Sequence, residues 1–414
     1  MRITVALRLP SALCQQPGAA DNGGMVSFLP DSLHRSLTPG AGKNESRLVT
    51  TPVRIGAVLA GVLLVGSACS TEPSAPETPQ ATTSVAAQGV AVPTVTGAVA
   101  QNLSAPWSVV PLNGAEQALI SERDSGRILL LDVNSGDTEQ VGQVPDLETA
   151  GEGGLMGLAL TENNKKLFAM YTAADGNKVV EYAWSGQDLG TPKDVITGIP
   201  RAQFHDGGRL AIGPDSLLYI ATGDAGTPDA AQDLDNLAGK ILRLDLDGAV
   251  PADNPFSGSP VYSLGHRNVQ GLAFDDNKNL WASEFGESDF DELNLITAGS
   301  NYGWPIHEGP SDDPDFVSPK ASWSPTATSS PSGIAYMSGS IWVAALRGET
   351  LWQVPIDGTE AGEPISRFAD EFGRLRDVAA AGSDELWVLT NNTDTRGTPK
   401  AQDDQIIGVQ VTSG

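Results

Sequence analysis

Cysteine and basic residues are both scarce in this chain of 414 residues. The two cysteines, Cys14 and Cys69, lie outside the part of the sequence that is expected to fold. Lysine and arginine total 25 against 51 aspartates and glutamates, which gives a formal charge of -26. Such a surface repels nucleic-acid phosphates and anionic lipid, so neither is expected as a partner. The acidity is explained either by solubility or by carboxylates that bind a divalent metal.

Helical periodicity and long apolar runs are also lacking. The 46 glycines and 28 prolines favour many short strands joined by turns. The apolar run Ile55–Val65 has eleven residues, fewer than the ~20 that a membrane-spanning helix needs. It fits the hydrophobic part of a secretory signal. A buried core helix is the weaker alternative, because a polar segment follows at once.

The residues after this run resemble a bacterial lipoprotein processing site. Gly66, Ser67 and Ala68 precede Cys69, which would become the lipidated N-terminus of an exported protein, anchored to the bacterial membrane at the cell surface or on the periplasmic side. Residues 1–68 are then a leader that is removed, and a true start near Met25 or later would explain its length. Residues 69–93 are rich in Ser, Thr, Pro and Ala, and are expected to form a disordered tether.

From about residue 94 the chain repeats one phrase, in which two apolar strands are joined by a polar turn and the second strand ends at a glycine. The intervals between these glycines are 50, 62, 51, 59 and 56 residues: Gly136, Gly186, Gly248, Gly299, Gly358 and Gly414. Periods near 50 with about four strands each are typical of propeller blades, whereas a β-sandwich has no reason to repeat. We therefore predict an all-β, six-bladed β-propeller over residues 94–414, with Thr94 to Ala100 completing the last blade.

A propeller brings one loop of every blade to the mouth of its central channel. The mature domain keeps three histidines, His205, His266 and His307, and its arginines occur at matching places between blades. Arginines that converge on the axis would bind a compact polycarboxylate or phosphate. Taken singly, each arginine is explained as well by a surface ion pair.

Six stretches in a fixed order give a more specific indication. They are GEGGLMGLAL, HDGGRLAIGPDSLLYIATGDAG, KILRLDLDG, YSLGHRNVQGLAF, SEFGESDFDELNLITAGSNYGWP and GRLRDV. Together they resemble the glucose/sorbosone dehydrogenase family over roughly residues 100–412. The resemblance implies oxidation of an aldose with pyrroloquinoline quinone (PQQ) and calcium, and transfer of the electrons to an external acceptor.

The resemblance also implies roles for individual residues. His205 matches the general base that takes the proton of the sugar hydroxyl, a role that suits imidazole near neutral pH. Arg267 and Asn268 match a pair that contacts the quinone oxygens, and Arg374 and Arg376 match a pair that reaches the cofactor and its carboxylates. Two further cofactor positions depart from the family's pattern. Arg347 stands where the best-known member has lysine, and Glu152 stands where some members have glutamine.

Calcium is implied at two places in one acidic segment. The carbonyls of Gly286 and Glu287 match ligands of the ion that bridges the protein and PQQ. Glu292 and Tyr302 match a second calcium site. Calcium takes six to eight oxygen ligands, including carbonyls, so such a segment is chemically suitable.

Two functions remain open at this stage. Phe204 stands where some members carry aspartate, so His205 is expected to lack an orienting carboxylate from that position, and the charge of Glu152 is expected to weaken cofactor binding. The intact base and arginines favour a dehydrogenase. The two departures favour a non-catalytic propeller on the cell surface that binds a protein or a glycan.

Overall fold

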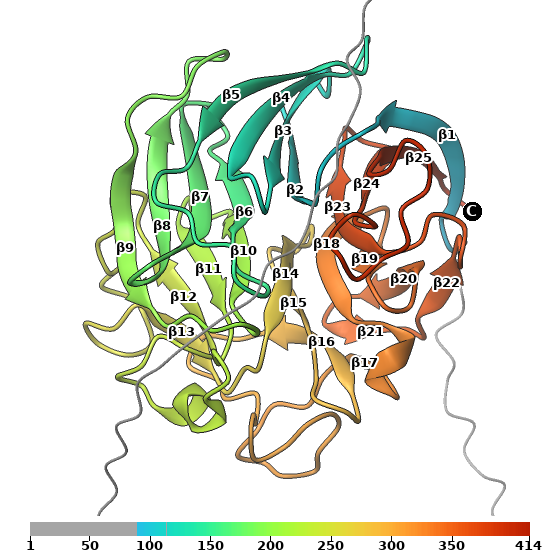
Figure 1. Cartoon of the computed structure of the whole chain (residues 1–414). Coiled ribbons are helices and arrows are strands. Elements are labelled where there is room, and N and C mark those ends of the chain that lie inside the picture. Colours follow the sequence, from blue (N-terminus) through green and yellow to red (C-terminus); the bar gives the residue numbers. More distant parts are fainter. Residues whose placement is uncertain (1–88, 113) are drawn as a thin grey trace, which may run out of the picture. The chain divides into compact units, whose positions relative to one another are not determined.

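Six antiparallel sheets surround a common axis in the computed structural model, which describes residues 89–112 and 114–414 (Figure 1). The sheets are the blades of a six-bladed β-propeller, as the repeat predicts. The predictions for residues 1–68 and for the tether up to residue 88 lie outside the described residues. The first strand begins at Val92, two residues before the boundary placed at residue 94.

Each blade runs from an innermost to an outermost strand. Blades 1 to 3 contain β2 (Pro106–Pro111), β3 (Gln117–Glu122), β4 (Arg127–Asp132), β5 (Thr138–Gln143); β6 (Leu155–Leu160), β7 (Lys166–Ala173), β8 (Gly176–Ala183), β9 (Lys193–Ile199); and β10 (Gly207–Ile212), β11 (Leu218–Thr222), β12 (Lys240–Leu244), β13 (Val261–Leu264). Blades 4 to 6 contain β14 (Val269–Phe274), β15 (Leu280–Glu284), β16 (Asp291–Ile296), β17 (Ala321–Trp323); β18 (Pro331–Met337), β19 (Ser340–Ala345), β20 (Thr350–Asp357), β21 (Glu360–Ala361), β22 (Ile365–Arg367); and β23 (Leu375–Ala380), β24 (Glu385–Thr390), β25 (Ile406–Thr412), β1 (Val92–Ala100).

The last blade is built from both ends of the described chain. Strand β1 pairs with β25 in an antiparallel register that runs from Val92 opposite Thr412 to Ala100 opposite Ile406. Figure 1 shows the two strands side by side, the first in blue and the last in red. The predicted closure of the ring by Thr94 to Ala100 is thus confirmed.

One position of the repeat fills the space between neighbouring blades. This position is the second residue of the apolar stretch in the second strand of each blade. The residues found there are at most 4% exposed: Leu119, Phe168, Tyr219, Trp281, Trp342 and Trp387. Each of these side chains belongs to a different hydrophobic cluster, and each cluster joins residues of neighbouring blades. Burying a large side chain stabilises the fold by about 1.5–3 kcal/mol. The residue that recurs in the sequence is therefore also the residue that packs the blades against one another.

All six innermost strands share an irregularity at their first residues. In every blade the pairing of the innermost strand with the next one shifts register within its first four residues. Such bulges bend a strand and re-aim its side chains. The bulges therefore change the direction of side chains at the start of all six innermost strands, which lie at one end of the axis.

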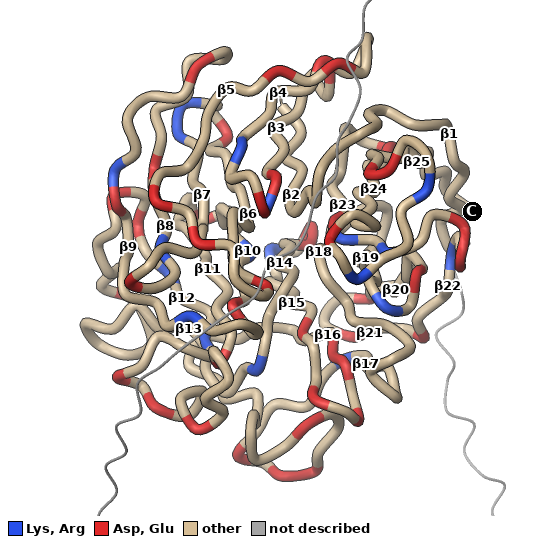
Figure 2. Tube along the Cα trace, in the orientation of Figure 1, with Lys and Arg blue, Asp and Glu red and all other residues tan. Residues whose placement is uncertain are grey.

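The described part of the chain has two short 3-10 helices, η1 (Pro228–Gln232) and η2 (Thr326–Thr328). Within that part, no helix has the length and apolar character needed to cross a membrane. Figure 2 shows acidic segments spread over the outer loops, while several basic segments lie near the middle, beside β14, β18 and β19.

Candidate active site

The predicted site residues gather where the innermost strands begin. Glu152 lies just before β6, His205 before β10 and Asn268 immediately before β14. Hydrogen bonds join these three loops. The His205 amide donates to Oε2 of Glu152 and the Gly207 amide to Oδ1 of Asn268, each at 3.0 Å. Loops of blades 2, 3 and 4 therefore form one continuous surface.

His205 is oriented by a carboxylate of its own blade. Its Nδ1 lies 2.7 Å from Oδ1 of Asp224, which follows β11 and is fully buried. Asp224 also accepts hydrogen bonds from the Gly226 amide and the Trp304 indole, both at 2.8 Å. Burial opposes ionisation of Asp224, but the contact with His205 and these two hydrogen bonds lower its pKa below the ordinary value. An ionised Asp224 requires the hydrogen on Nδ1, so Nε2 of His205 keeps the lone pair of a general base.

Position 204 supplies no carboxylate to His205, as expected. Phe204 is 48% exposed and its ring meets that of His205 edge-on at 4.8 Å. Asp224 supplies the carboxylate instead. Its place in a Gly-Asp-Ala-Gly turn directly after a strand was visible in the sequence, but no local pattern linked it to His205.

Glu152 is also paired. Its Oε1 lies 2.9 Å from Nη1 of Arg396, a residue that sequence reasoning missed. Burial opposes ionisation of Glu152, but the His205 amide and Arg396 lower its pKa. The Glu152 charge is therefore offset within the protein.

Four arginines are buried close to one another: Arg123, Arg209, Arg374 and Arg376. The guanidinium groups of Arg209 and Arg376 lie 4.3 and 5.6 Å from the ring of Trp107. Arg374 pairs with Asp394 at 3.2 Å. Burial lowers the pKa of Arg376 to about 9, and repulsion by Arg123 and Arg374 adds to the effect. The sequence did not single out Arg123, and it placed Arg209 only in a loop cluster.

Several donors of this region are buried and have no acceptor among the described residues: Arg209 Nη2, Arg267 Nε, Asn268 Nδ2, Arg374 Nε and Arg376 Nε. An unsatisfied buried donor costs about 1–3 kcal/mol. A ligand that offers several anionic oxygens would satisfy them. The residues present therefore fit a polycarboxylate such as PQQ.

Arg267 and Arg347 lie nearer to solvent. The Arg267 guanidinium is 5.3 Å from the Trp304 ring, and its Nη1 donates to the Phe285 carbonyl at 3.3 Å. Arg347 follows β19, whose last residue pairs with the first residue of β18, so it lies at the same end of the propeller. Its side chain is exposed. The structure places Arg347 on the rim and not with the buried arginines.

Three of the four predicted calcium ligands, Gly286, Glu292 and Tyr302, line a small cavity of about 10 Å³ together with Glu284 and Glu308, whereas Glu287 is not part of its lining. Burial and the neighbouring Glu284 raise the pKa of Glu292 to about 8. The Tyr302 hydroxyl donates to the Leu295 carbonyl at 2.7 Å, so its main chain is the part left to face a cation. Over residues 89–112 and 114–414, no three His, Cys, Asp or Glu side chains converge as a metal site. Calcium would therefore depend on main-chain carbonyls, which suits its preference for oxygen.

The other two histidines have structural partners. His266 is fully buried, with Nδ1 2.9 Å from Oε2 of Glu284 and its ring stacked on Tyr302 at 4.7 Å. His307 lies 3.3 Å from Asp313. His266 thus also has a buried carboxylate on Nδ1, but its Nε2 is bonded to Ser263, whereas the side chain of His205 is 15% exposed.

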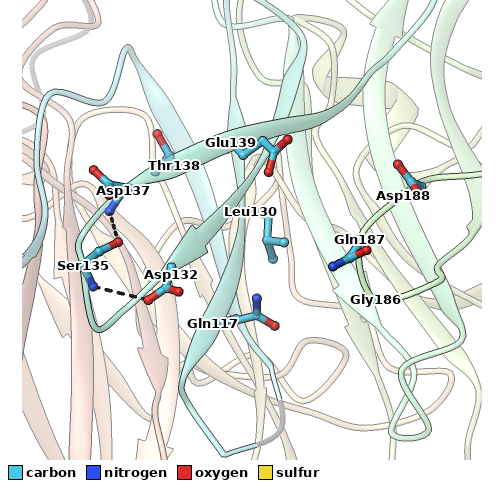
Figure 3. Close-up of a pocket in the computed structure, with 10 residues that line it drawn as sticks. All are labelled: Gln117, Leu130, Asp132, Ser135, Asp137, Thr138, Glu139, Gly186, Gln187 and Asp188. Carbon is cyan, nitrogen blue, oxygen red and sulfur yellow. Dashed lines mark hydrogen bonds between the residues drawn. The ribbon is translucent and has the colours of Figure 1, made fainter.

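A wider groove of about 620 Å³ lies at the periphery, between the β4–β5 edge of blade 1 and a turn of blade 2 (Figure 3). Its polar lining is mainly acidic, with Asp132, Asp137, Glu139 and Asp188. None of the predicted site residues lines it, so the larger volume does not mark the candidate site.

Residues 103–398 match the family model described as Glucose / Sorbosone dehydrogenase. The chain is 36% identical over 260 residues to quinoprotein glucose dehydrogenase B of Acinetobacter calcoaceticus, which covers 53% of this chain and 54% of that protein. It thus spans about half the length of this relative. It is 30% identical over 328 residues to an aldose sugar dehydrogenase of Escherichia coli (strain K12), with 70% and 88% covered.

A solved structure is similar over a larger share of both chains. It is the PQQ-bound form of the aldose sugar dehydrogenase from Streptomyces coelicolor, which is 46% identical. The similarity covers 78% of this chain and 99% of that chain, with a TM-score of 0.76.

Proposed function

The chain belongs to the glucose/sorbosone dehydrogenase family, and from this premise we propose that it is a PQQ- and calcium-dependent dehydrogenase that oxidises an aldose and passes the electrons to an external acceptor. The observation that carries the proposal is the His205–Asp224 pair, which stands beside buried arginines with unpaired donors. A neutral base next to a polycationic cradle is what this chemistry needs. A non-catalytic binding surface has no need of either.

When bound, PQQ supplies an ortho-quinone that accepts a hydride from the sugar. His205 would take the hydroxyl proton at Nε2, while Asp224 holds Nδ1–H and stabilises the imidazolium that forms. Arg374 and Arg376 would bind the cofactor carboxylates. Arg267 and Asn268 would donate to the quinone oxygens, where negative charge develops.

Calcium would be held by the carbonyls of Gly286 and Glu287, beside PQQ, and by Glu292 with the main chain of Tyr302 at a second place. Carbonyl and carboxylate oxygens are the ligands that calcium prefers. The rim residues Glu152 and Arg347 would border the cofactor from the solvent side.

The test is reconstitution of purified protein with PQQ and calcium, followed by an assay against a panel of aldoses with a dye acceptor. Wild type should turn over at least one aldose, and His205→Ala should lower turnover by about 10²–10⁴-fold while PQQ still binds. Loss of Arg374 or Arg376 should weaken PQQ binding first. A wild type that binds PQQ and oxidises no aldose would replace this function with the surface-binding propeller.

We also propose that the enzyme is exported and held to a bacterial membrane through a lipid on Cys69. The support is the apolar run followed by Gly66, Ser67 and Ala68. Expression of Cys69→Ala in a bacterial host should move the protein from the membrane fraction to the soluble fraction. Unchanged partitioning would reject the anchor.

A further inference from the structure

Glu308 holds the loop that follows β15 by an unusual set of hydrogen bonds. Its Oε1 accepts from four successive backbone amides, those of residues 287, 288, 289 and 290, at 2.8, 3.1, 3.0 and 3.0 Å. Successive amides that converge in this way form a concave site for an anion. Here the anion is a side chain of the protein, from a segment about twenty residues further along the chain.

The direction of these amides determines the direction of two carbonyls. In a trans peptide unit the N–H of one residue points away from the C=O of the residue before it. The amide of Glu287 shares a peptide unit with the carbonyl of Gly286, and the amide of Ser288 shares one with the carbonyl of Glu287. Because both amides point at Glu308, both carbonyls point away from it.

The loop is fixed at its start as well. The Gly286 amide donates to Oδ1 of Asp291 at 3.0 Å, and the Phe285 carbonyl accepts from Arg267. A Cβ at Gly286 would lie 1.8 Å from the Phe290 carbonyl oxygen and 2.5 Å from Oε1 of Glu308. The turn is therefore tight enough that only glycine fits inside it.

The segment that carries Glu308 is tied to the second predicted calcium ligand too. The amide of Gly309 donates to Oε1 of Glu292 at 2.7 Å. A Cβ at Gly309 would lie 2.4 Å from the Phe290 ring, so this residue packs against the same loop. The short segment of Glu308 and Gly309 therefore forms hydrogen bonds to residues of both predicted calcium sites.

We propose that Glu308 is a positioning residue, which turns the carbonyls of Gly286 and Glu287 toward calcium without binding the ion itself. Although Glu308 also lines the small cavity, its Oε1 already accepts from four amides, and hydrogen bonds to an ionised acceptor are the strong ones. Residues behind metal ligands that orient them typically change metal affinity by about 10–100-fold when lost. The inference rests on the proposed calcium site.

The test compares Glu308→Ala, Glu308→Gln and wild type as full chains without PQQ. Calcium affinity is measured by competition with terbium luminescence, and hydrogen exchange is measured for a peptide covering residues 286–290. The glutamine variant keeps an acceptor oxygen but loses the charge. The matched control is Asp289→Ala, which removes an exposed carboxylate from the same loop.

Glu308→Ala should speed exchange of the loop amides by about 10-fold or more and weaken calcium binding by about 10–100-fold. Glu308→Gln should keep most of both properties, and Asp289→Ala should match wild type. If glutamine loses calcium as alanine does while exchange stays slow, Glu308 is a ligand and the proposal is wrong. Unchanged exchange or unchanged affinity in Glu308→Ala also overturns it. A wild type that binds no calcium refutes the calcium site itself, which is a different failure.

Discussion

Nδ1 of His205 and Oδ1 of Asp224 are 2.7 Å apart, although two β-strands, β10 and β11, separate the two residues in the sequence. Asp224 is held in turn by the indole of Trp304, from the loop between β16 and β17 of blade 4. The imidazole is thus oriented by a chain of hydrogen bonds that crosses from one blade to the next. Such a chain fixes both the tautomer and the ring plane before any substrate arrives.

We expect Asp224→Asn to lower turnover of the reconstituted enzyme by about 10²–10⁴-fold, because an amide no longer requires the hydrogen on Nδ1. Cofactor affinity should stay within a few-fold of wild type, since the side chain of Asp224 bonds to His205, Gly226 and Trp304 and to no arginine. Steady-state kinetics and PQQ titration measure the two effects separately. Asp229→Asn, an exposed carboxylate in the same loop, is the control and should keep full turnover. Equal turnover in both variants would remove Asp224 from the mechanism.

The fold was predictable because its packing is local and repeated. The aromatic position of the repeat, for example Trp281 or Trp342, is both a sequence signal and the side chain that fills the space between blades. Ring closure followed from the apolar strand before the first repeat. The strand ends differ by only two residues at Val92.

The partners within the site were not predictable in the same way. Arg209 meets Asp377 across 168 positions of the chain, and Glu152 meets Arg396 across 244. No spacing rule connects residues on different blades, because the contact depends on how the ring closes. Arg347 was predicted to be a cofactor residue from its position at the end of a blade. The structure places it at that end, but its side chain faces solvent.

Chelation should destabilise wild type if Glu292 helps to hold calcium. A ligand at about 100 times its Kd adds about 2.7 kcal/mol, which corresponds to about 4 °C in the Tm of a domain of this size. EDTA should lower the Tm of wild type by that amount and change that of Glu292→Ala much less. Asp312→Ala, an exposed carboxylate in a nearby loop, should respond as wild type does. Equal shifts in all three proteins would reject the site.

Lys240 should make stability depend on pH in the alkaline range. Its side chain is fully buried, and Nζ donates to the carbonyls of Ala230 and Ala238, each at 2.7 Å. Burial lowers its pKa from 10.5 to about 8. Between these values the unfolded chain binds the proton and the folded chain does not, so the free energy of unfolding rises with pH, on the order of 3 kcal/mol in total.

Lys240→Met should lack this rise. Urea unfolding of both proteins at pH 7.5 and pH 10.5 measures the rise. The tyrosines that titrate in this pH range are present in both proteins, so the difference between the two proteins isolates the contribution of Lys240. If the free energies of unfolding of wild type and Lys240→Met differ by the same amount at both pH values, the ammonium keeps its ordinary proton affinity in the fold.

Arg209 and Asp377 form a buried ion pair between the innermost strands of blades 3 and 6. Nη1 of Arg209 lies 2.9 Å from Oδ2 of Asp377, and the residues are 5% and 3% exposed. Gly333 makes room for this pair, because a Cβ there would lie 1.9 Å from Oδ1 of Asp377. Removing one partner leaves the other charge buried and unpaired, which costs about 3–5 kcal/mol.

A double-mutant cycle with Arg209→Met and Asp377→Asn, measured by chemical denaturation without cofactor, tests the pair. Each single variant should lose about 3–5 kcal/mol, and the double variant should lose less than the sum by about 1–3 kcal/mol. The matched control is Lys320–Glu360, a pair of similar length at 2.8 Å whose glutamate is 71% exposed. Its coupling should stay within about 0.2–1 kcal/mol, because water screens it. If the two cycles gave the same coupling, burial would add nothing to the pair, and Gly333 would need another reason.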